Sequence, residues 1–354
     1  MRPLSPADAI QPAIERTRDL LFRPFRAGTL LKLGAVAFFA EASGSLSLTN
    51  PGRMGGLPDM SPQARAILYS VVLASGIGLL LFSLVLFYVG SRLQLVMVEL
   101  VATRAKVVGP LWRKSGRLTW RWVGVRALFF LSIVIVVAAV AGPFFFAILK
   151  HPPPPGTMPI NFFGNLLLVL AIALPLILVL GVVYILLRDF ALPFVVFEGL
   201  PVTTAVRRVR SLLAAEGASV ALYVLLRFSL VLVGALAAEI TIVFVLLISL
   251  IPVGLVGGVL WFFLRNSGPL GTGFLIGAGI VGGGLFLVWM MCVAIAVFGA
   301  VFLFTQAYAL YFLGGRYPML GEILDRTSSP PAFVGYPPGW PGMPGAPGPV
   351  RGAY

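Results

Sequence analysis

The sequence has few of the side chains that usually carry out chemistry or face water. Its 354 residues include one histidine, one cysteine and 12 carboxylates, and only 11% of the chain is charged. A soluble domain has about a quarter of its residues charged. With 59% apolar residues and a mean hydropathy of +1.01, this composition excludes an ordinary soluble globular fold.

The scarcity of histidine and aspartate also narrows the possible catalytic chemistry. Hydrolysis normally uses histidine or clustered carboxylates, often around a metal. His151 stands beside four prolines in a loop, and Asp189 is the single aspartate close to an apolar run. The sequence therefore lacks the residues for the aspartyl pair of an intramembrane aspartyl protease and for the Ser–His pair of an intramembrane serine protease. We expect a protein that is not an enzyme and that has no metal and no cofactor.

One motif matches a nucleotide-binding pattern by chance. Residues 277–282 read Gly-Ala-Gly-Ile-Val-Gly, but no strand or acidic ribose ligand accompanies them. We interpret the small residues here, including Gly279 and Gly283, as sites where two membrane helices approach closely.

Six apolar runs reach or approach the roughly 20 residues that one membrane crossing needs. They lie at 27–42, 66–90, 123–149, 162–187, 218–264 and 271–313. The last two are about twice the required length, so each could be one long helix or two spans. Because neither contains a polar turn, we expect one principal crossing in each, with a tilted or re-entrant remainder.

The expected fold class is therefore an all-α integral membrane protein with about six transmembrane helices in three hairpins. Basic amphipathic segments at 6–24, 101–121 and 201–215 should form elbow helices before each hairpin. In the first elbow the apolar face consists of Ile10, Ala13, Ile14, Thr17, Leu20 and Leu21. The opposite face consists of Glu15, Arg16, Arg18 and Asp19. We expect an amphipathic cytoplasmic helix in 1–26, a membrane domain in 27–315 and a disordered Pro/Gly-rich tail in 316–354.

The basic residues are placed asymmetrically around these spans. The formal net charge is +14, and 21 lysines and arginines fall on one side of the six-span arrangement against 4 on the other. This bias predicts a multi-pass protein of a prokaryotic inner membrane with both termini in the cytoplasm.

Anionic lipids, rather than nucleic acid, are the expected partners of these charges. The candidate lipid-binding residues are Arg207, Arg208, Arg210, Arg113, Lys114 and Arg117. The tail segment 336–340, Tyr-Pro-Pro-Gly-Trp, could also dock into a polyproline-reading groove of a protein partner.

The ionisable residues near the apolar core are Glu41, Asp189, Glu198, Arg227 and Glu239. The candidate intramembrane polar residues among them are Asp189, Arg227 and Glu239. Arg227 and Glu239 are separated by about 18 Å along a helix, so they cannot pair within it. If the helix enters the membrane near Ala218, Glu239 reaches the far headgroups. If it enters near Phe228, Glu239 is central and would suggest ion coupling. We expect the first arrangement.

Two short segments resemble a known family. Residues 188–198 read Arg-Asp-Phe-Ala-Leu-Pro-Phe-Val-Val-Phe-Glu, and residues 31–39 read Leu-Lys-Leu-Gly-Ala-Val-Ala-Phe-Phe. Both are similar to uncharacterised six-span prokaryotic membrane proteins related to YciC and to the membrane domain of some glycerophosphodiester phosphodiesterases. The resemblance covers roughly residues 5 to 325 and implies an inner-membrane protein without an assigned reaction. The catalytic barrel of those phosphodiesterases is absent.

Three functions stay open at this point. The favoured one is a non-enzymatic protein that scaffolds partners or lipids at the cytoplasmic face. The alternative is a transporter or channel that uses an intramembrane acidic residue, for which a polar cavity at mid-membrane would be decisive. A lipid-active enzyme would need clustered polar residues at one interface, which the sequence scarcely supplies.

Overall fold

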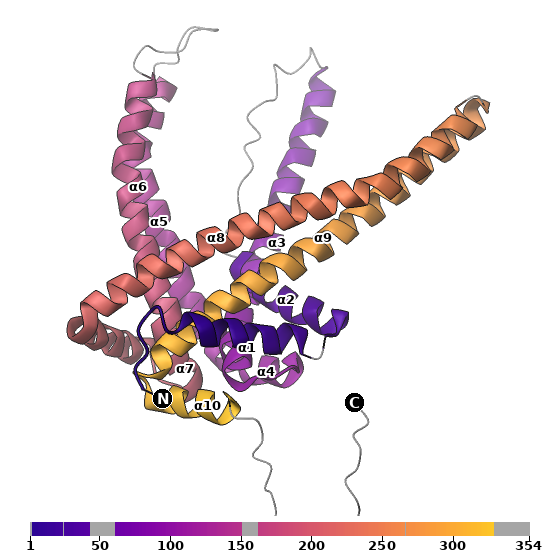
Figure 1. Cartoon of the computed structure of the whole chain (residues 1–354). Coiled ribbons are helices and arrows are strands. Elements are labelled where there is room, and N and C mark those ends of the chain that lie inside the picture. The colour runs from indigo at the N-terminus through magenta and orange to yellow at the C-terminus, as the bar shows by residue number, and fades with distance from the viewer. Residues whose placement is uncertain (1, 24, 43–60, 151–161, 266, 329–354) are drawn as a thin grey trace, which may run out of the picture.

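All regular structure in the described part of the chain is helical. The computed structural model describes residues 2–23, 25–42, 61–150, 162–265 and 267–328. The helices are α1 (Ile10–Phe22), α2 (Ala27–Ala42), α3 (Pro62–Thr103), α4 (Val108–Lys114), α5 (Gly116–Lys150), α6 (Phe162–Leu186), the π-helical turn η1 (Leu187–Ala191), α7 (Leu192–Glu198), α8 (Val202–Leu264), α9 (Gly268–Gly314) and α10 (Pro318–Ser328). The all-α prediction is confirmed for these residues (Figure 1).

Five helical segments are long and apolar enough to cross a membrane, so the chain has the character of a multi-pass membrane protein. They are Leu68–Thr103, Gly116–Phe144, Gly164–Glu198, Val202–Leu264 and Leu270–Gly314. The sixth expected span is α2, whose 16 residues give a length of about 24 Å. This is shorter than the roughly 30 Å of a hydrocarbon core. Among the described residues, five spanning helices are therefore shown, and the sixth is not confirmed.

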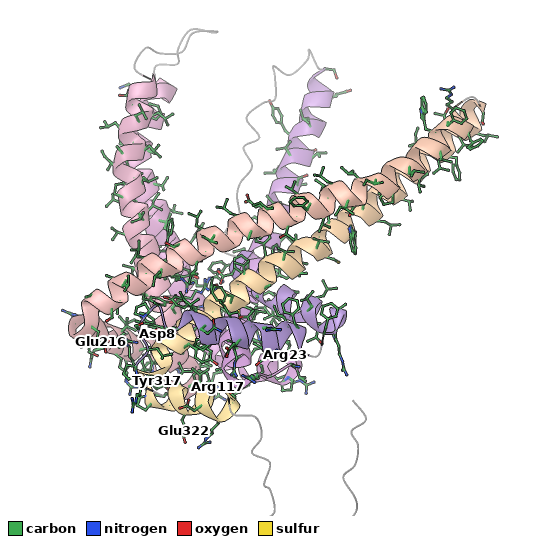
Figure 2. All side chains as sticks on the ribbon, viewed as in Figure 1. Asp8, Arg23, Arg117, Glu216, Tyr317 and Glu322 are labelled. Atoms are coloured by element: carbon green, nitrogen blue, oxygen red, sulfur yellow. The ribbon has the colours of Figure 1, made fainter. Side chains whose placement is uncertain are left out.

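The molecule divides into a buried core at one end and three apolar arms that diverge from it (Figure 1). The arms are the first part of α3 (68–86), the α5–α6 pair (127–150 and 162–183) and the α8–α9 pair (228–264 and 268–291). In the most apolar window of each spanning helix at most 6% of the residues are buried. Figure 2 shows the arm side chains pointing outward, whereas the labelled Arg117, Glu216 and Glu322 lie around the core. Surfaces this apolar need lipid, not water, around them.

The α8–α9 arm is much longer than the other two. Helix α8 has non-helical backbone angles at Glu216, with φ −132° and ψ 43°, and continues through Pro252 to Leu264. From Gly217 to Leu264 the helical rise gives about 70 Å. Each of the two long apolar runs is thus one continuous helix. In Figure 1 this arm runs obliquely, and its free end lies at a height similar to the free ends of the other two arms.

Two glycines allow α2 and α9 to touch in the core. A Cβ atom added to Gly299 would lie 2.6 Å from the carbonyl oxygen of Gly34, and one added to Gly34 would lie 2.9 Å from the carbonyl oxygen of Ile295. By contrast, Gly279 and Gly283 on the α8–α9 arm have nothing within 4 Å of such a Cβ. The expectation that these two glycines mediate close helix packing is therefore wrong, and the close approach lies at Gly34 and Gly299.

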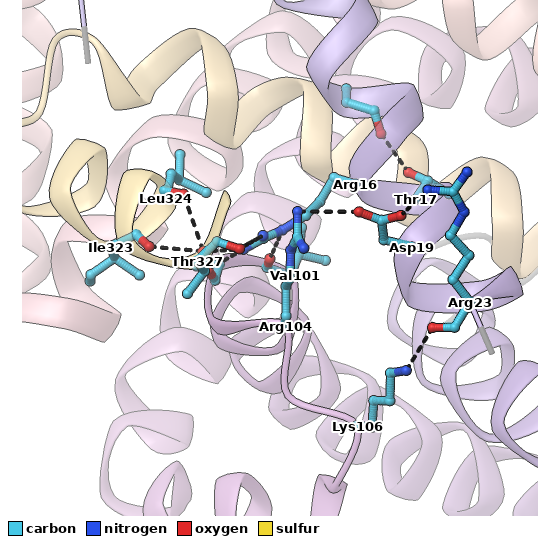
Figure 3. Close-up of polar contacts among 12 residues, drawn as sticks. Arg16, Thr17, Asp19, Arg23, Val101, Arg104, Lys106, Ile323, Leu324 and Thr327 are labelled. Carbon is cyan, nitrogen blue, oxygen red and sulfur yellow. Dashed lines mark hydrogen bonds and ion pairs between the residues drawn. The ribbon is translucent and has the colours of Figure 1, made fainter. Parts of the chain in front are cut away.

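Arg16 connects three helices of the core (Figure 3). Its side chain is fully buried. It donates hydrogen bonds to the carbonyl oxygens of Val101 (2.9 Å) and Ala102 and to the hydroxyl of Thr327 (2.8 Å). Carbonyls in the last turn of a helix have no partner within it, so Arg16 caps α3 while holding α10. Burial lowers the pKa of Arg16 to about 10.

The position of Arg16 corrects the expected faces of the first elbow. A helical projection puts Arg16 opposite the apolar stripe, yet it is buried beside Ala13, Leu20 and Leu21, whereas Ile14 of the expected apolar stripe is exposed. The polar partners of Arg16 come from α3 and α10, which a projection of one helix does not include.

The remaining elbows and the tail also differ in detail from expectation. The segment 101–121 is divided among the end of α3, the short helix α4 and the start of α5. The segment 201–215 forms the first part of α8, up to the Glu216 kink. Helix α10 lies inside the predicted tail 316–354 and packs against α9 and α3. Residues 329–354, which hold the predicted disordered tail and its 336–340 motif, lie outside the described residues, as do His151 and its prolines.

We predict that Gly299→Leu separates α2 from α9. Forcing a side chain into a tight contact costs typically 1–3 kcal/mol. In a chain of 354 residues we therefore expect the thermal unfolding midpoint of the detergent-solubilised protein to fall by roughly 1–4 °C. Gly283→Leu is the matched control on the same helix, and its midpoint should stay within about 1 °C of wild type because the added side chain meets open space. Equal losses for the two variants would contradict the packing at Gly34 and Gly299.

Candidate functional site

A buried ion-pair network lies in the core and begins at the π-helical turn η1. In a regular α-helix, the ring of Pro193 would clash with the carbonyl group of Asp189, four residues earlier, and proline has no N–H to donate. The chain instead widens into a π turn, in which the Leu192 N–H donates to the Leu187 carbonyl oxygen. Such turns often occur at functional sites. This one leaves Arg188 and Asp189 buried between helices.

Asp189 binds two side chains of α8. The Tyr223 hydroxyl donates a hydrogen bond of 2.7 Å to Asp189 Oδ2, and Arg227 forms an ion pair with the same oxygen. Arg227 Nη1 also lies 3.2 Å from the Tyr223 hydroxyl. Because Tyr223 and Arg227 are four residues apart, they project from one face of α8. The carboxylate therefore connects η1 to the end of the α8–α9 arm that joins the core. We call this end of each arm its root.

Arg188 extends the network toward α2. Its Nη1 donates a hydrogen bond of 2.5 Å to Glu41 Oε2, and its Nε lies 3.8 Å from Asp189 Oδ1. The charges alternate along the network in the order Glu41, Arg188, Asp189 and Arg227, and the four side chains together have no net charge. Buried ions are tolerated when paired in this way, but removing one partner leaves its neighbour uncompensated.

Aromatic rings enclose this network. The Tyr223 ring lies 5.0 Å from Phe190, 5.2 Å from Tyr308 and 4.6 Å from Phe312, measured between centroids. Tyr308 Oη, Asp189 Oδ1 and both amide atoms of Gln306 are buried and accept or donate no hydrogen bond within the described chain. The network thus lies in an apolar, aromatic setting, where ionic contacts are poorly screened.

A second polar cluster lies between α3 and α5. The Trp122 indole N–H donates to Gln94 Oε1 at 2.8 Å, and the Gln94 amide donates to the Ala40 carbonyl oxygen at 2.9 Å. Arg126 donates to the Ser91 hydroxyl at 2.9 Å. These contacts join the root of the α5–α6 arm to α3 and α2.

The structure separates the three intramembrane candidates. Asp189 and Arg227 form a direct pair, which sequence reasoning missed. Glu239 is exposed on the α8–α9 arm and does not pair with Arg227. The missed pair had two sequence signals, an Arg-Asp dipeptide shortly before a proline and a tyrosine four residues before an arginine. Glu41, the partner of Arg188, had one signal, because it is a carboxylate inside the apolar run 27–42.

The predicted lipid-binding residues fall into two groups. Arg208 and Lys114 are neutralised: Arg208 Nη1 lies 2.8 Å from each carboxylate oxygen of Glu198, and Lys114 Nζ lies 2.5 Å from Glu99 Oε1. The other members are exposed and have no ion-pair partner among the described residues. They are Arg207, Arg210, Arg113 and Arg117.

No part of the described chain brings three His, Cys, Asp or Glu side chains together as a metal site would. The chemistry offered by the described residues is thus paired charge inside the core and free positive charge outside it.

The chain belongs to a family of unknown function, DUF7544, whose family model matches residues 4–323. No curated protein and no solved structure matches the chain. The family is uncharacterised, as the sequence resemblance implied, but nothing in these comparisons connects it to YciC or to glycerophosphodiester phosphodiesterases.

We predict that Asp189→Asn strongly destabilises the protein, because Arg227 would keep its buried charge without a counterion. Breaking one side of a buried pair costs about 3–5 kcal/mol. The thermal unfolding midpoint in detergent should therefore fall by roughly 4–7 °C.

Glu239→Gln is the matched carboxylate control for this measurement. Its side chain is exposed, so the midpoint should change by less than about 2 °C. The double variant Asp189→Asn/Arg227→Gln should recover part of the loss, since it removes both charges. An Asp189→Asn protein as stable as wild type would show that the pair does not support the core.

Proposed function

We propose that this protein is a non-enzymatic membrane protein whose cytoplasmic face associates with anionic lipids and scaffolds partners there. The observation that carries the proposal is the set of exposed, unpaired arginines at the roots of the arms, on the first part of α8 and around α4. Each basic side chain near an anionic surface contributes about 1 kcal/mol of attraction. Arg207 and Arg210 are the closest such pair in the sequence.

The position of α1 and α10 supports an even number of crossings. Arg16 of α1 and Thr327 of α10 both bind the C-terminal end of α3. The two terminal helices thus lie at the same end of the molecule, whereas α3 begins at the other end. With both termini on one side, the chain would cross once before α3, and we propose that this first crossing lies in the region of α2. This gives six crossings with both termini in the cytoplasm of a prokaryotic cell, in agreement with the bias of basic residues.

The alternative of a transporter or channel has less support. A carboxylate that carries a proton or a cation through a membrane needs access to the ion. Asp189 is fully buried, and one of its oxygens is bound by Arg227 and Tyr223. We therefore propose that the Asp189 network holds the core together and carries no ion flux.

The proposed topology predicts the location of reporter fusions. Fusions after residues 55, 155 and 268 should be extracytoplasmic, and those after residues 115, 214 and 330 cytoplasmic. A reporter pair that is active on opposite sides of the membrane, such as alkaline phosphatase and green fluorescent protein, gives the measurement. A cytoplasmic signal at 155 would overturn the topology.

The proposed lipid association predicts that Arg207→Gln/Arg210→Gln reduces selectivity for anionic phospholipid. Two charges near the surface amount to about 2 kcal/mol, or roughly a 30-fold preference at low salt. The measurement is the anionic fraction of lipid around the protein in mixed nanodiscs at low and high salt, since screening should remove the effect. Arg208→Gln/Glu198→Gln, which removes an ion pair without changing the net charge, is the control and should leave the anionic selectivity unchanged. Unaltered selectivity in the double variant would refute the elbow as a lipid-binding surface.

A further inference from the structure

A groove lies where the α8–α9 arm leaves the core. Its volume is about 460 Å³, within the range of small-molecule sites. Its walls come from η1, α7, the first part of α8, the end of α9 and the start of α10. The apolar lining includes Phe190, Phe194, Leu212 and Leu313, and the polar lining Arg208, Ser211, Arg316 and Tyr317.

The groove adjoins the part of the chain that enters the membrane. Ala215 lines it and directly precedes the Glu216 kink, beyond which α8 extends into the arm. Leu313 lines it from the last turn of α9. In the proposed placement this is the level of the lipid headgroups. A ligand here can have its polar part beside the core and its apolar part along the root of the arm.

The charges around the groove come in two balanced pairs. Arg208 binds both oxygens of Glu198, and Arg316 binds Glu216 with Nε 2.8 Å and Nη2 2.7 Å from Oε2. Arg316 is also fixed by hydrogen bonds to the carbonyl oxygens of Leu4 and Phe312. Both carboxylates remain accessible, with 23% of the Glu198 side chain and 39% of the Glu216 side chain exposed.

Tyr317 adds a hydroxyl beside the first pair. Burial and hydrogen bonding to Glu198 raise the pKa of Tyr317, so its hydroxyl stays protonated beside that carboxylate. The groove therefore offers a guanidinium donor for a phosphate, and the carboxylates paired with its arginines lie beside it as acceptors for an ammonium group.

We propose that this groove binds one phospholipid with a zwitterionic headgroup that carries a primary ammonium, as in phosphatidylethanolamine. Its phosphate lies on Arg208, whose side chain is 46% exposed, its ammonium on Glu198 or Glu216, and an acyl chain covers the apolar lining. This inference rests on the membrane placement proposed above but not on the anionic selectivity of Arg207 and Arg210.

The balance of charge selects this headgroup over the alternatives. An anionic headgroup would meet arginines that are already neutralised and would be repelled by the two carboxylates. A zwitterion supplies one charge to each partner and keeps the balance. A trimethylammonium group has no N–H to donate to a carboxylate. It would favour an aromatic face, but the Arg208 guanidinium already lies 5.4 Å from the Phe194 ring centroid.

The test uses the full-length protein purified in mild detergent, with native mass spectrometry of the retained lipid. Ala215→Trp should fill the groove. Ala214→Trp is the matched control, because Ala214 is the exposed neighbour that does not line it. We expect about one phosphatidylethanolamine per chain in wild type and Ala214→Trp, and at least tenfold lower occupancy in Ala215→Trp. Equal occupancy in the two tryptophan variants would overturn the site.

The headgroup is tested by adding defined lipids to delipidated protein. Phosphatidylethanolamine should bind at least tenfold more tightly than phosphatidylglycerol or phosphatidylcholine, and glycerophosphoethanolamine, which lacks acyl chains, should not displace it. Preferred binding of phosphatidylglycerol to wild type, or displacement by the soluble headgroup, would overturn the proposal.

A charge variant keeps the test informative if Ala215→Trp folds poorly. Glu198→Gln/Glu216→Gln removes both carboxylates, so its preference should shift toward phosphatidylglycerol, a gain that misfolding cannot produce. No such shift would count against the ammonium contact. Arg207→Gln/Arg210→Gln should leave phosphatidylethanolamine occupancy unchanged, so failure of the elbow proposal and failure of the groove proposal give different results.

Discussion

The arms of this protein pack little against one another, so its tertiary structure depends on the core at their roots. A membrane bundle usually gains stability from helix packing along the span. Here the lipid-facing windows have few buried residues, and the buried side chains concentrate in α1, α2, the end of α3, η1, α7, the first part of α8, the end of α9 and α10. The relative placement of three long arms is therefore set by contacts within a small region.

The ion network suits this task because its contacts are directional. The π turn brings Arg188 and Asp189 into the core on consecutive residues, yet their main partners are on different helices, Glu41 of α2 and Arg227 of α8. Apolar contacts would tolerate small rotations of α8, whereas an ion pair shared with Tyr223 fixes which face of α8 meets η1. The contact between Gly34 and Gly299 adds a steric constraint on α2 and α9. The two helices come this close because neither glycine has a side chain.

Local patterns in the sequence anticipated the elements better than their contacts. The apolar runs mark the arms, because apolar length depends only on neighbouring residues. Arg16 was misplaced because its partners are carbonyls of α3 and a hydroxyl of α10, distant in sequence. The glycine-rich segment near Gly279 suggested helix packing by its density. The real contact uses two isolated glycines, which are recognised only when α2 and α9 are placed together.

The depth of Glu239 shows how a residue's position in the membrane depends on the core. Glu239 follows Gly217 by about 33 Å of helix, which would span a hydrocarbon core if α8 stood upright. The α8–α9 arm is instead oblique, and Glu239 lies close to midway between the Glu216 kink and Arg265 at its free end. The depth of a residue in the membrane follows from its distance along the helix only when the tilt of that helix is known. Packing where the helix joins the core, rather than the length of its apolar run, sets that tilt. The same ion network that fixes α8 against η1 thus also determines how deep the exposed carboxylate of Glu239 lies.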